Sequence, residues 1–539
     1  MAAQRLRHVV FTVLLLGCLL AVGAERALAS AAIVTSAGDS GAGSMRDQAA
    51  IPGTDSLLFN LANGAMINLA SSLDLGTTDF IFSNMTTGGV LNLLGSTLRG
   101  SGTLSISGSN HFNFTNPLNF TGGLKAAGAV SANITLADYT GGRIALGTGP
   151  YSTYGGTFSG KLNIQGQNQS GTGTQYGGGF AGYTPFNPSY LSLLGGSVIS
   201  NNTLTSQNTG ASVEAFGGGL YGRGGFSTLA GTISGNTAVA VNTGTFGANA
   251  GGGGVYAYNI GNLSATISGN TARASVASNY NSSAGGGGIY VYDGGTITSL
   301  SGAISGNAAT VSTGDTSGYA SGGGVGAGLI TGFTGSVSNN TASATATGSG
   351  DAYAQGGGLS LGSAASLAGT VSGNTASATA EGSGQAVALG GGMMLGSANA
   401  PAITGGEYTN NRAIATGANA RAEGGAIFID TWIGNPNLVL DPTAGAITFR
   451  GNSVTTKANA ADTGVTTPNA IHFGQYNGNS DVNASLTLRD STFMANQIII
   501  ADGITVDMNN GKSFTMTSAD NTYFNWGGPN IFDAAGGST

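Results

Sequence analysis

Two short phrases recur along the chain at a nearly constant spacing, and this repeat constrains the fold more than any other feature. A run of glycines leads into an aliphatic or aromatic segment, as in Gly252-Gly253-Gly254-Val255-Tyr256, and similar runs begin at Gly217, Gly286, Gly322, Gly356, Gly390 and Gly424. Between the runs stands Ile/Val-Ser-Gly-Asn, whose asparagines follow one another after 34, 34, 37, 33, 34 and 37 residues. With weaker copies at both ends, these asparagines are Asn202, Asn236, Asn270, Asn307, Asn340, Asn374 and Asn411. A period of this length indicates a stacked array in which no single repeat buries a core alone.

Each repeat is expected to form short strands. Val255-Tyr256-Ala257-Tyr258 and Ala342-Ser343-Ala344-Thr345-Ala346 alternate between two faces with the period of a strand. The glycine runs and the Ser-Gly-Asn corners would interrupt a helix, which argues against an array of helical repeats. About three short strands per repeat, separated by tight corners, describe one coil of a parallel β-helix, and each coil would stack roughly 4.8 Å above the last.

Such a coil explains both phrases structurally. An asparagine amide repeated at one corner can donate to its counterpart in the next coil, so we expect the asparagines to form a hydrogen-bonded ladder. Glycine permits the close backbone approach and the positive φ that a corner requires. We therefore interpret the asparagines and the glycine runs as structural elements rather than as a ligand site.

The composition favours one elongated all-β domain and excludes several classes of partner. Glycine accounts for 98 of the 539 residues and only 7% of residues are charged, whereas an ordinary domain has about a quarter. A hydrophobic share of 40%, combined with the alternation, argues against disorder. The net charge of −7 and the absence of a Lys/Arg cluster in the sequence argue against a nucleic-acid partner.

The N-terminus predicts export. Arg5 and Arg7 precede an apolar run over 9–22, and Ala27-Leu28-Ala29 forms a small-x-small cleavage site, so residues 1–29 are predicted to be a signal peptide. The alternatives are an internal strand or a membrane anchor, for which the run is short. Leu15-Leu16-Gly17-Cys18 loosely resembles a bacterial lipoprotein box. Because Cys18 is the only cysteine, ordinary cleavage would leave a mature chain without disulfides or thiolate chemistry.

Two further stretches resemble known bacterial surface proteins. Residues 39–46, which read Asp-Ser-Gly-Ala-Gly-Ser-Met-Arg, and the strand at 55–59 resemble the opening D-S-G-x-G-S-L-R and D-x-I-x-F elements of surface β-helix proteins, with Met45 in place of leucine. This resemblance implies that the segment caps the first coils.

The far end of the array is similar to polymorphic outer membrane proteins and related autotransporter passengers. Gly424-Gly425-Ala426-Ile427, Phe449-Arg450-Gly451-Asn452 and Phe493-Met494-Ala495-Asn496 match their G-G-A-[ILV] and F-x-x-N repeats. The resemblance covers most of residues 200–500 and implies a right-handed parallel β-helix displayed at a bacterial surface. Those proteins normally end in a membrane β-barrel, whereas this sequence stops at Thr539. We therefore expect outer membrane association through a missing barrel or a separate anchor, or release from the cell.

The expected organisation is a signal peptide over 1–29 and an N-terminal cap with irregular coils over 30–199. Regular coils follow over 200–425, and terminal coils with a cap occupy 426–539. No catalytic residue, metal or cofactor is predicted. His111 and His472 have no recognisable nucleophile nearby, and the sequence contains no H-E-x-x-H, calcium-loop or P-loop motif.

One charged group keeps an enzymatic alternative open. Glu407, Glu423 and Asp430 lie near Arg412 and Arg421 in the sequence. Glycoside hydrolysis needs two carboxylates about 5–10 Å apart, and neighbouring coils could supply such a pair. The other interpretation of the group is a set of salt bridges at the rim.

A row of tyrosines is the candidate binding surface. Tyr221, Tyr256 and Tyr290 occupy one position of the repeat, with Tyr258 and Tyr292 two residues further on. If their aliphatic neighbours point inward, these rings face out and stack along the solenoid, where they could bind sugar rings or a protein. Cross-coil stacking that only stabilises one face is the alternative.

These features predict an exported bacterial cell-surface β-helix protein with a structural or adhesive role. Its expected partner is a protein or glycan of a host or neighbouring cell. A secreted or surface β-helix lyase or glycoside hydrolase that degrades polysaccharides is the alternative.

Overall fold

The computed structural model describes residues 30–506 and the strand at 514–519, with short gaps. The gaps are 86–88, 109–110, 127–131, 148–153, 186–189, 278–279, 293, 397–400, 432–435, 477–483 and 490–497. The predicted signal peptide over 1–29, with Cys18, and the motif at 493–496 lie outside the described residues.

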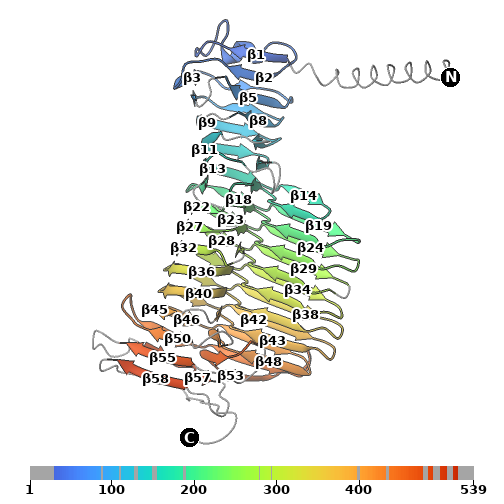
Figure 1. The fold of residues 1–539 in the computed structure, drawn as a ribbon, viewed down its shortest axis with the longest axis vertical. Coiled ribbons are helices and arrows are strands. Elements are labelled where there is room, and N and C mark those ends of the chain that lie inside the picture. Colours follow the sequence, from blue (N-terminus) through green and yellow to red (C-terminus); the bar gives the residue numbers. More distant parts are fainter. Residues whose placement is uncertain are drawn as a thin grey trace, which may run out of the picture.

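The chain winds into a right-handed parallel β-helix, which confirms the predicted fold class (Figure 1). Successive coils stack along the long axis, and equivalent residues of neighbouring coils pair in register, as Val255 does with Leu220 and Ile289. Of the described strand pairs, only that between β52 (Ser453–Lys457) and β53 (Val465–Pro468) is antiparallel.

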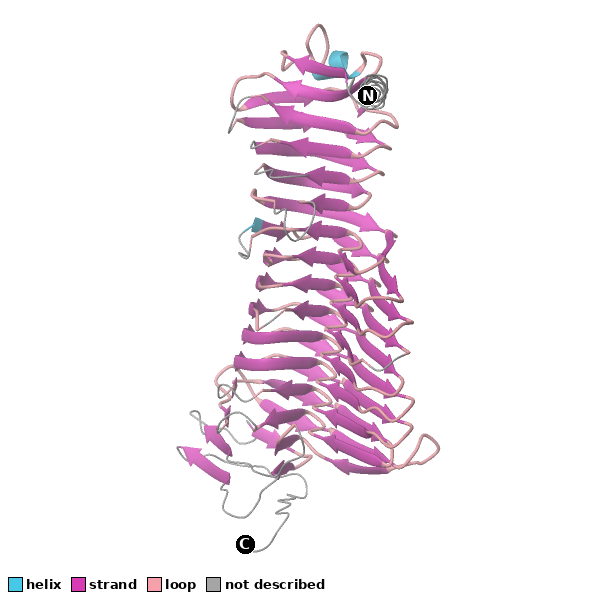
Figure 2. Cartoon of the chain, turned by 45° about the vertical axis from the view of Figure 1, so that its right-hand side comes forward, coloured by secondary structure: helices cyan, strands magenta, loops and turns pink. Residues whose placement is uncertain are grey.

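The segment that resembles the opening of surface β-helix proteins lies at the N-terminal end of the described solenoid (Figure 2). It forms the short helix α2 (Met45–Ala49), which packs on β1 (Ser30–Val34) and β2 (Thr54–Phe59). The Oγ of Ser44 accepts the N–H of Asp47 at 3.2 Å and caps this helix. Met45, in place of the usual leucine, is fully buried against the first coil.

The coils are narrow as far as β13 (Phe158–Gln165) and then widen (Figure 1). The narrow part contributes strands only to a 40-stranded sheet, which we call the body. From residue 168 onward two additional sheets of 10 and 8 strands run beside the body, and we call this pair the wing. The widening begins about one coil before residue 200, where the regular repeats were expected.

The strands of the 10-stranded sheet are β14 (Asn168–Gly171), β19 (Thr203–Asn208), β24 (Thr237–Asn242), β29 (Thr271–Val276), β34 (Ala308–Thr313), β38 (Thr341–Ala346), β42 (Thr375–Ala380), β47 (Arg412–Thr416), β52 and β53. The strands of the 8-stranded sheet are β15 (Thr174–Tyr176), β20 (Val213–Phe216), β25 (Ala248–Gly251), β30 (Ser282–Gly285), β35 (Gly318–Ser321), β39 (Ala352–Gln355), β43 (Gln385–Leu389) and β48 (Asn419–Glu423). The body strands that follow the glycine runs are β16 (Phe180–Gly182), β21 (Leu220–Gly222), β26 (Val255–Ala257), β31 (Ile289–Val291), β36 (Val325–Phe333), β40 (Leu359–Leu367), β44 (Met393–Leu395) and β49 (Ile427–Asp430). Two further strands, β54 (Ile471–Gly474) and β57 (Ile504–Val506), continue this series by parallel pairing without a glycine run before them.

A wide coil therefore has more strands than the three that the sequence suggested. The coil that starts after Asn236 runs through β24 and β25 in the wing, and then through β26, β27 (Ile260–Leu263) and β28 (Thr266–Ser268) in the body. The expected number was wrong because the chain makes an excursion into the wing and back before the coil closes.

Body and wing have separate cores of different composition. The body core consists mainly of Ile, Leu, Val and Phe, whereas the wing core is almost entirely alanine. Ala342, Ala344 and Ala346 of β38 are at most 1% exposed, while Ser343 and Thr345 face outward, as the alternation predicted. Because a buried methyl group contributes far less free energy than a Leu or Ile side chain, the wing depends strongly on its hydrogen bonds.

The predicted asparagine ladder joins wing to body. From Asn202 to Asn411, each Nδ2 donates to the Oδ1 of the next asparagine at 2.8–3.0 Å. Each Oδ1 also accepts the backbone N–H of the preceding asparagine, as Asn340 does from Asn307 at 2.9 Å. Each Nδ2 donates to a body carbonyl too, such as Asn340 to Ile304 at 3.0 Å. These asparagines are 0–1% exposed, and their side-chain amides have hydrogen-bond partners, as buried amides require.

The glycine runs return the chain from wing to body directly beside this ladder, and each glycine has its own role. Gly252 has φ of 60°, a left-handed conformation that favours glycine. A Cβ on Gly253 would stand 2.3 Å from the carbonyl carbon of Thr271, so the two backbones cross in contact. A Cβ on Gly254 would stand 3.0 Å from Cγ of Asn270. The two recurring phrases are therefore the two halves of one junction.

Candidate binding groove

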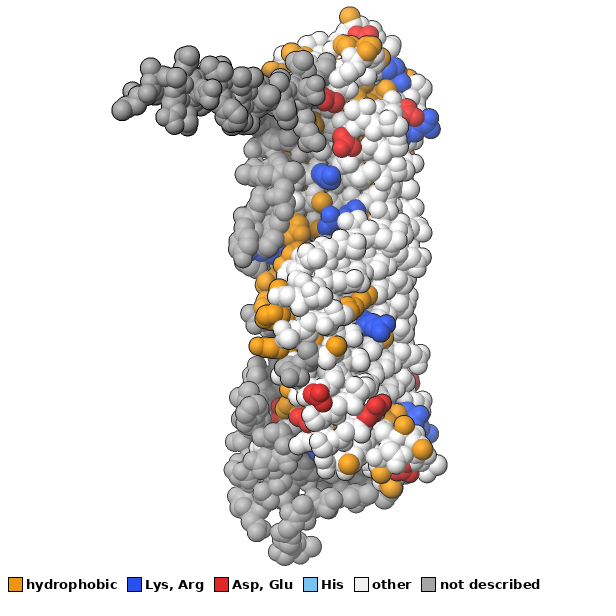
Figure 3. All heavy atoms as spheres, turned by 90° about the vertical axis from the view of Figure 1, so that its right-hand side faces the viewer, with side chains coloured by type: hydrophobic (Ala, Val, Ile, Leu, Met, Phe, Trp, Pro, Cys, Tyr) orange, Lys and Arg blue, Asp and Glu red, His pale blue; other side chains and the backbone are white. Residues whose placement is uncertain are grey.

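The inside corner between wing and body forms a groove that runs along the solenoid. One wall carries the outward side chains of the 8-stranded sheet, and the other carries those of the body strands that follow the glycine runs. We call this feature the corner groove. Figure 3 views the molecule from the wing side and shows few charged side chains over most of this face, with hydrophobic side chains gathered along one edge at mid-height.

Aromatic rings fill the upper part of the corner groove. Tyr221 lies 4.6 Å from Tyr176, and Tyr256 lies 4.5 Å from Phe216, measured between ring centroids. Tyr176 and Phe216 belong to the wing, so the wing covers the body tyrosines. Tyr221 and Tyr256 are only 3% exposed, and this burial raises the pKa of both phenols.

The expectation that the tyrosine row is exposed is thus wrong for Tyr221 and Tyr256. They point away from the body core as predicted, but the second sheet folds back over them. Tyr258 and Tyr290 are half-buried, and Tyr292 is 38% exposed. The rings still stack from coil to coil, with centroids 5.6 Å apart between Tyr256 and Tyr290 and 5.0 Å apart between Tyr258 and Tyr292.

Around and below Tyr290 the corner groove is hollow, mainly because the body wall carries no ring in register with Tyr290 in the next two coils. Tyr256 and Tyr290 face the wing glycines Gly251 and Gly285, at which a Cβ would meet the rings. In register with Tyr290, the next body residues are Gly326 and then Ser360. The facing wing residues there, Ser321 and Gln355, do not fill the space.

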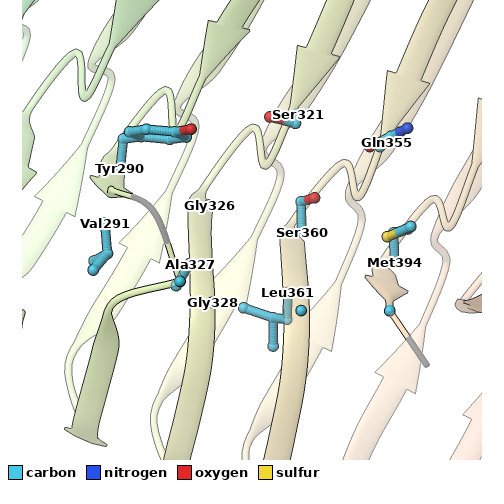
Figure 4. Close-up of a pocket in the computed structure, with 13 residues that line it drawn as sticks. Tyr290, Val291, Ser321, Gly326, Ala327, Gly328, Gln355, Ser360, Leu361 and Met394 are labelled. Carbon is cyan, nitrogen blue, oxygen red and sulfur yellow. The ribbon is translucent and has the colours of Figure 1, made fainter. Parts of the chain in front are cut away.

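Two cavities of about 400 Å³ and 330 Å³ occupy this middle part. They share Tyr290, Ser321 and Gln355, so they form one trough. Figure 4 shows the larger cavity, with Tyr290 and Met394 at opposite ends and Ser360 between them.

The wing wall of the corner groove carries a second pair of stacked rings, of which Tyr319 lines the trough. Tyr319 and Tyr353 stack at 4.9 Å with an interplanar angle of 5°. The hydroxyl of Tyr353 donates to Oδ2 of Asp351 at 3.1 Å, and burial first and this carboxylate second raise the pKa of Tyr353 to about 12. The Tyr353 phenol is therefore a neutral hydrogen-bonding group at physiological pH.

The lower end of the corner groove is closed by a compact charged and aromatic cluster. Arg421 binds Glu423 at 2.9 Å and donates to the backbone carbonyls of Gln475 and Tyr476. His472 lies 3.7 Å from Glu423 through its Nε2, and its ring stacks on Phe428.

The structure brings together only part of the predicted charged group. Asp430 accepts the N–H of Tyr476 at 3.2 Å, so it joins the cluster around Arg421 and Glu423. Glu407 and Arg412 are exposed on β46 (Gly406–Thr409) of the body and β47 of the 10-stranded sheet, respectively. These two residues are close in sequence but do not join the cluster in space, because the coil places them on different sheets.

The trough itself is poor in reactive groups. Its one described acidic lining residue is Glu214, whose Oε2 accepts the hydroxyl of Thr174 at 2.8 Å. Over the described ranges, no three His, Cys, Asp or Glu side chains gather to hold a metal ion. No helical segment there reaches the length and hydrophobicity that a bilayer span requires.

Sequence reasoning missed residues that line the trough, among them Tyr319, Ser321, Gln355 and Ser360. A usable signal was present, because the tyrosine series stops at Tyr290 and the next equivalent residue is Gly326. A large residue that disappears from one position of an otherwise regular array indicates a hollow.

Comparison of the chain with family models, curated proteins and solved structures finds no match. The geometry of the corner groove is therefore the basis for a functional proposal.

Proposed function

We propose that this protein is an exported bacterial cell-surface β-helix protein of the autotransporter-passenger or polymorphic outer membrane protein type, with a structural and adhesive role. The corner groove would be its contact surface for a host or neighbouring cell. The observation that carries the proposal is the trough, a hollow of two adjoining cavities lined by aromatic and polar side chains.

Three features support the adhesive role. A β-helix is a long rigid scaffold, and sites built on such elements are more precise than sites on loops. The trough combines aromatic rings with hydroxyl and amide groups, which is typical of ligand-binding sites. The repeat and F-x-x-N motifs of residues 200–500 resemble those of surface-displayed passengers.

Localisation in the native bacterium tests the export and display. We expect the full chain in the outer membrane fraction, held by a barrel or a separate anchor, and accessible to protease on intact cells. Cells lacking the protein should adhere less to host or neighbouring cells. Protein confined to the cytoplasm, or unchanged adhesion of the deletion strain, would overturn the proposal.

A second candidate is a polysaccharide-degrading enzyme. The observation that favours it is the convergence of Glu423 and Asp430 around Tyr476 at the lower end of the corner groove. Release of reducing ends or unsaturated products from a polysaccharide, abolished by Glu423→Gln, would establish it. Absence of product over a panel of neutral and acidic polysaccharides would dismiss it.

A further inference from the structure

We infer that the trough binds a neutral, extended oligosaccharide that lies along the solenoid axis. The inference rests on the proposed function and specifies the class of its ligand. It follows from the shape, the chemistry and the charge of the trough, and from the hydrogen-bonded pairing of the strands that line it.

The shape suits a linear chain with one repeating unit per coil. The two cavities are continuous through Tyr290, Ser321 and Gln355, and together they run from the coil of Glu214 to that of Met394. Successive coils rise by roughly 4.8 Å, which is comparable with the length of one sugar ring in an extended chain. The aromatic cluster around Tyr256 closes one end of the trough, and the cluster around Phe428 closes the other.

The chemistry suits sugar rings. A sugar has an apolar C–H face that packs on aromatic rings, and hydroxyl groups at its edge that exchange hydrogen bonds. Tyr290 and Tyr292 present rings on the body wall, and Tyr319 presents its ring on the wing wall. Ser321, Gln355 and Ser360 place hydroxyl and amide groups between them.

The charge argues for a neutral chain. The described lining of both cavities contains no Lys or Arg. A uronic acid, a sulfated glycan or a nucleic acid would therefore place its anions in the trough without a counter-charge, and Glu214 at one end would repel them.

The strand pairing argues against a peptide. A peptide in a groove of this kind gains affinity by adding a strand to an open sheet edge. Here β36 is paired with β31 and β40, and β39 is paired with β35 and β43. Their backbone N–H and C=O groups are already engaged in the ladders, so only side chains and the surface of the rings remain to bind.

The test uses the full chain, titrated calorimetrically with linear hexasaccharides of β-linked glucose and mannose, with an oligogalacturonate for comparison. Ser360→Tyr places a ring at the same repeat position as Tyr290, two coils further on, and fills the trough. Tyr292→Ala removes an exposed ring without disturbing the core. Ser377→Tyr, on the outer face of β42, is the matched control.

We expect a neutral hexasaccharide to bind, Ser360→Tyr and Tyr292→Ala each to weaken it about tenfold or more, and Ser377→Tyr to leave it unchanged. Binding of the oligogalacturonate alone, binding of no oligosaccharide, or equal binding by all variants would overturn the inference. An adhesion assay with the native bacterium distinguishes failure of the ligand inference from failure of the proposed function. If adhesion persists in the Ser360→Tyr strain, the proposed function stands and the trough is not its site.

Discussion

The Nδ2 of Asn452 donates a hydrogen bond to Oδ2 of Asp502 at 2.8 Å, and this contact ends the asparagine ladder. Asn411 donates to Asn452 in the same way at 3.0 Å, so the ladder runs one asparagine beyond the predicted series. Asp502 also accepts the backbone N–H groups of Gly451 and Asn452 at 2.9 and 2.8 Å. A carboxylate accepts hydrogen bonds and donates none, so it terminates a chain of amides that all donate in one direction.

Removal of this terminator should loosen the last coils. Asp502→Ala leaves three N–H groups without their acceptor, two of them on the buried Asn452, and Asp502→Asn retains one of the two oxygens. We expect stability in the order wild type, Asp502→Asn, Asp502→Ala, with faster hydrogen exchange at Gly451 and Asn452. Equal exchange in all three proteins would contradict a terminating role.

A substitution inside the ladder should cost more than one at the surface. Asn340→Ala deprives Asn307 of an acceptor for both its Nδ2 and its backbone N–H. Each buried polar group left without a partner costs about 1–3 kcal/mol, so the urea midpoint should fall clearly. Asn262→Ala, at an exposed position of β27, is the control and should change stability by about 0.5 kcal/mol or less. Equal midpoints for the two variants would refute the ladder's contribution.

The middle glycine of a run should not tolerate a methyl group. In Gly253→Ala, the added Cβ would meet backbone atoms of Thr271 and Gly287 at 2.3 and 2.4 Å. Overpacking against backbone costs about 1–3 kcal/mol or more, which thermal unfolding would report. At Gly195 nothing lies within 4 Å of a Cβ, so Gly195→Ala should behave like the wild type. A stable Gly253→Ala variant would mean that the junction can widen.

The tyrosine row should divide into structural and surface members. Tyr256→Ala empties a buried site between wing and body and should cost about 3–5 kcal/mol. Tyr292→Ala, at 38% exposure, should cost about 0.5 kcal/mol or less. Denaturant unfolding of both variants measures the difference. Similar losses would indicate that Tyr292 also supports the corner.

Alkaline pH should destabilise the fold. The pKa of Tyr353 is raised from 10.0 to about 12, mainly by burial, and burial also raises the pKa of Tyr221 and Tyr256. In this range the unfolded state loses its phenolic protons first, so stability is full below pH 10 and falls between about pH 10 and 12. Tyrosinate absorbance and circular dichroism should change together. Titration of all 17 tyrosines near pH 10 without unfolding would contradict this expectation.

The residues at the junction between wing and body were predictable from the sequence, because the local backbone geometry at each position requires a particular residue type. A positive φ at Gly252, a backbone crossing at Gly253 and an amide repeated at Asn270 and its equivalents each require a particular residue type at a particular place. Such requirements recur with every coil and leave a period in the sequence. Asn452 could have been added to the ladder, since it ends a Phe-x-x-Asn motif, but Asp502 gave no periodic signal.

The sequence by itself determined that the chain stacks in parallel coils, with asparagines and glycines in contact at each coil. Only the tertiary structure decided which outward face is covered. Alternation shows that Tyr221, Tyr256 and Tyr290 point away from the body core, but not that the wing lies across two of them and leaves the space beside the third open. Burial depends on what a second sheet places opposite a side chain, and that is a property of the assembled coils rather than of any one repeat.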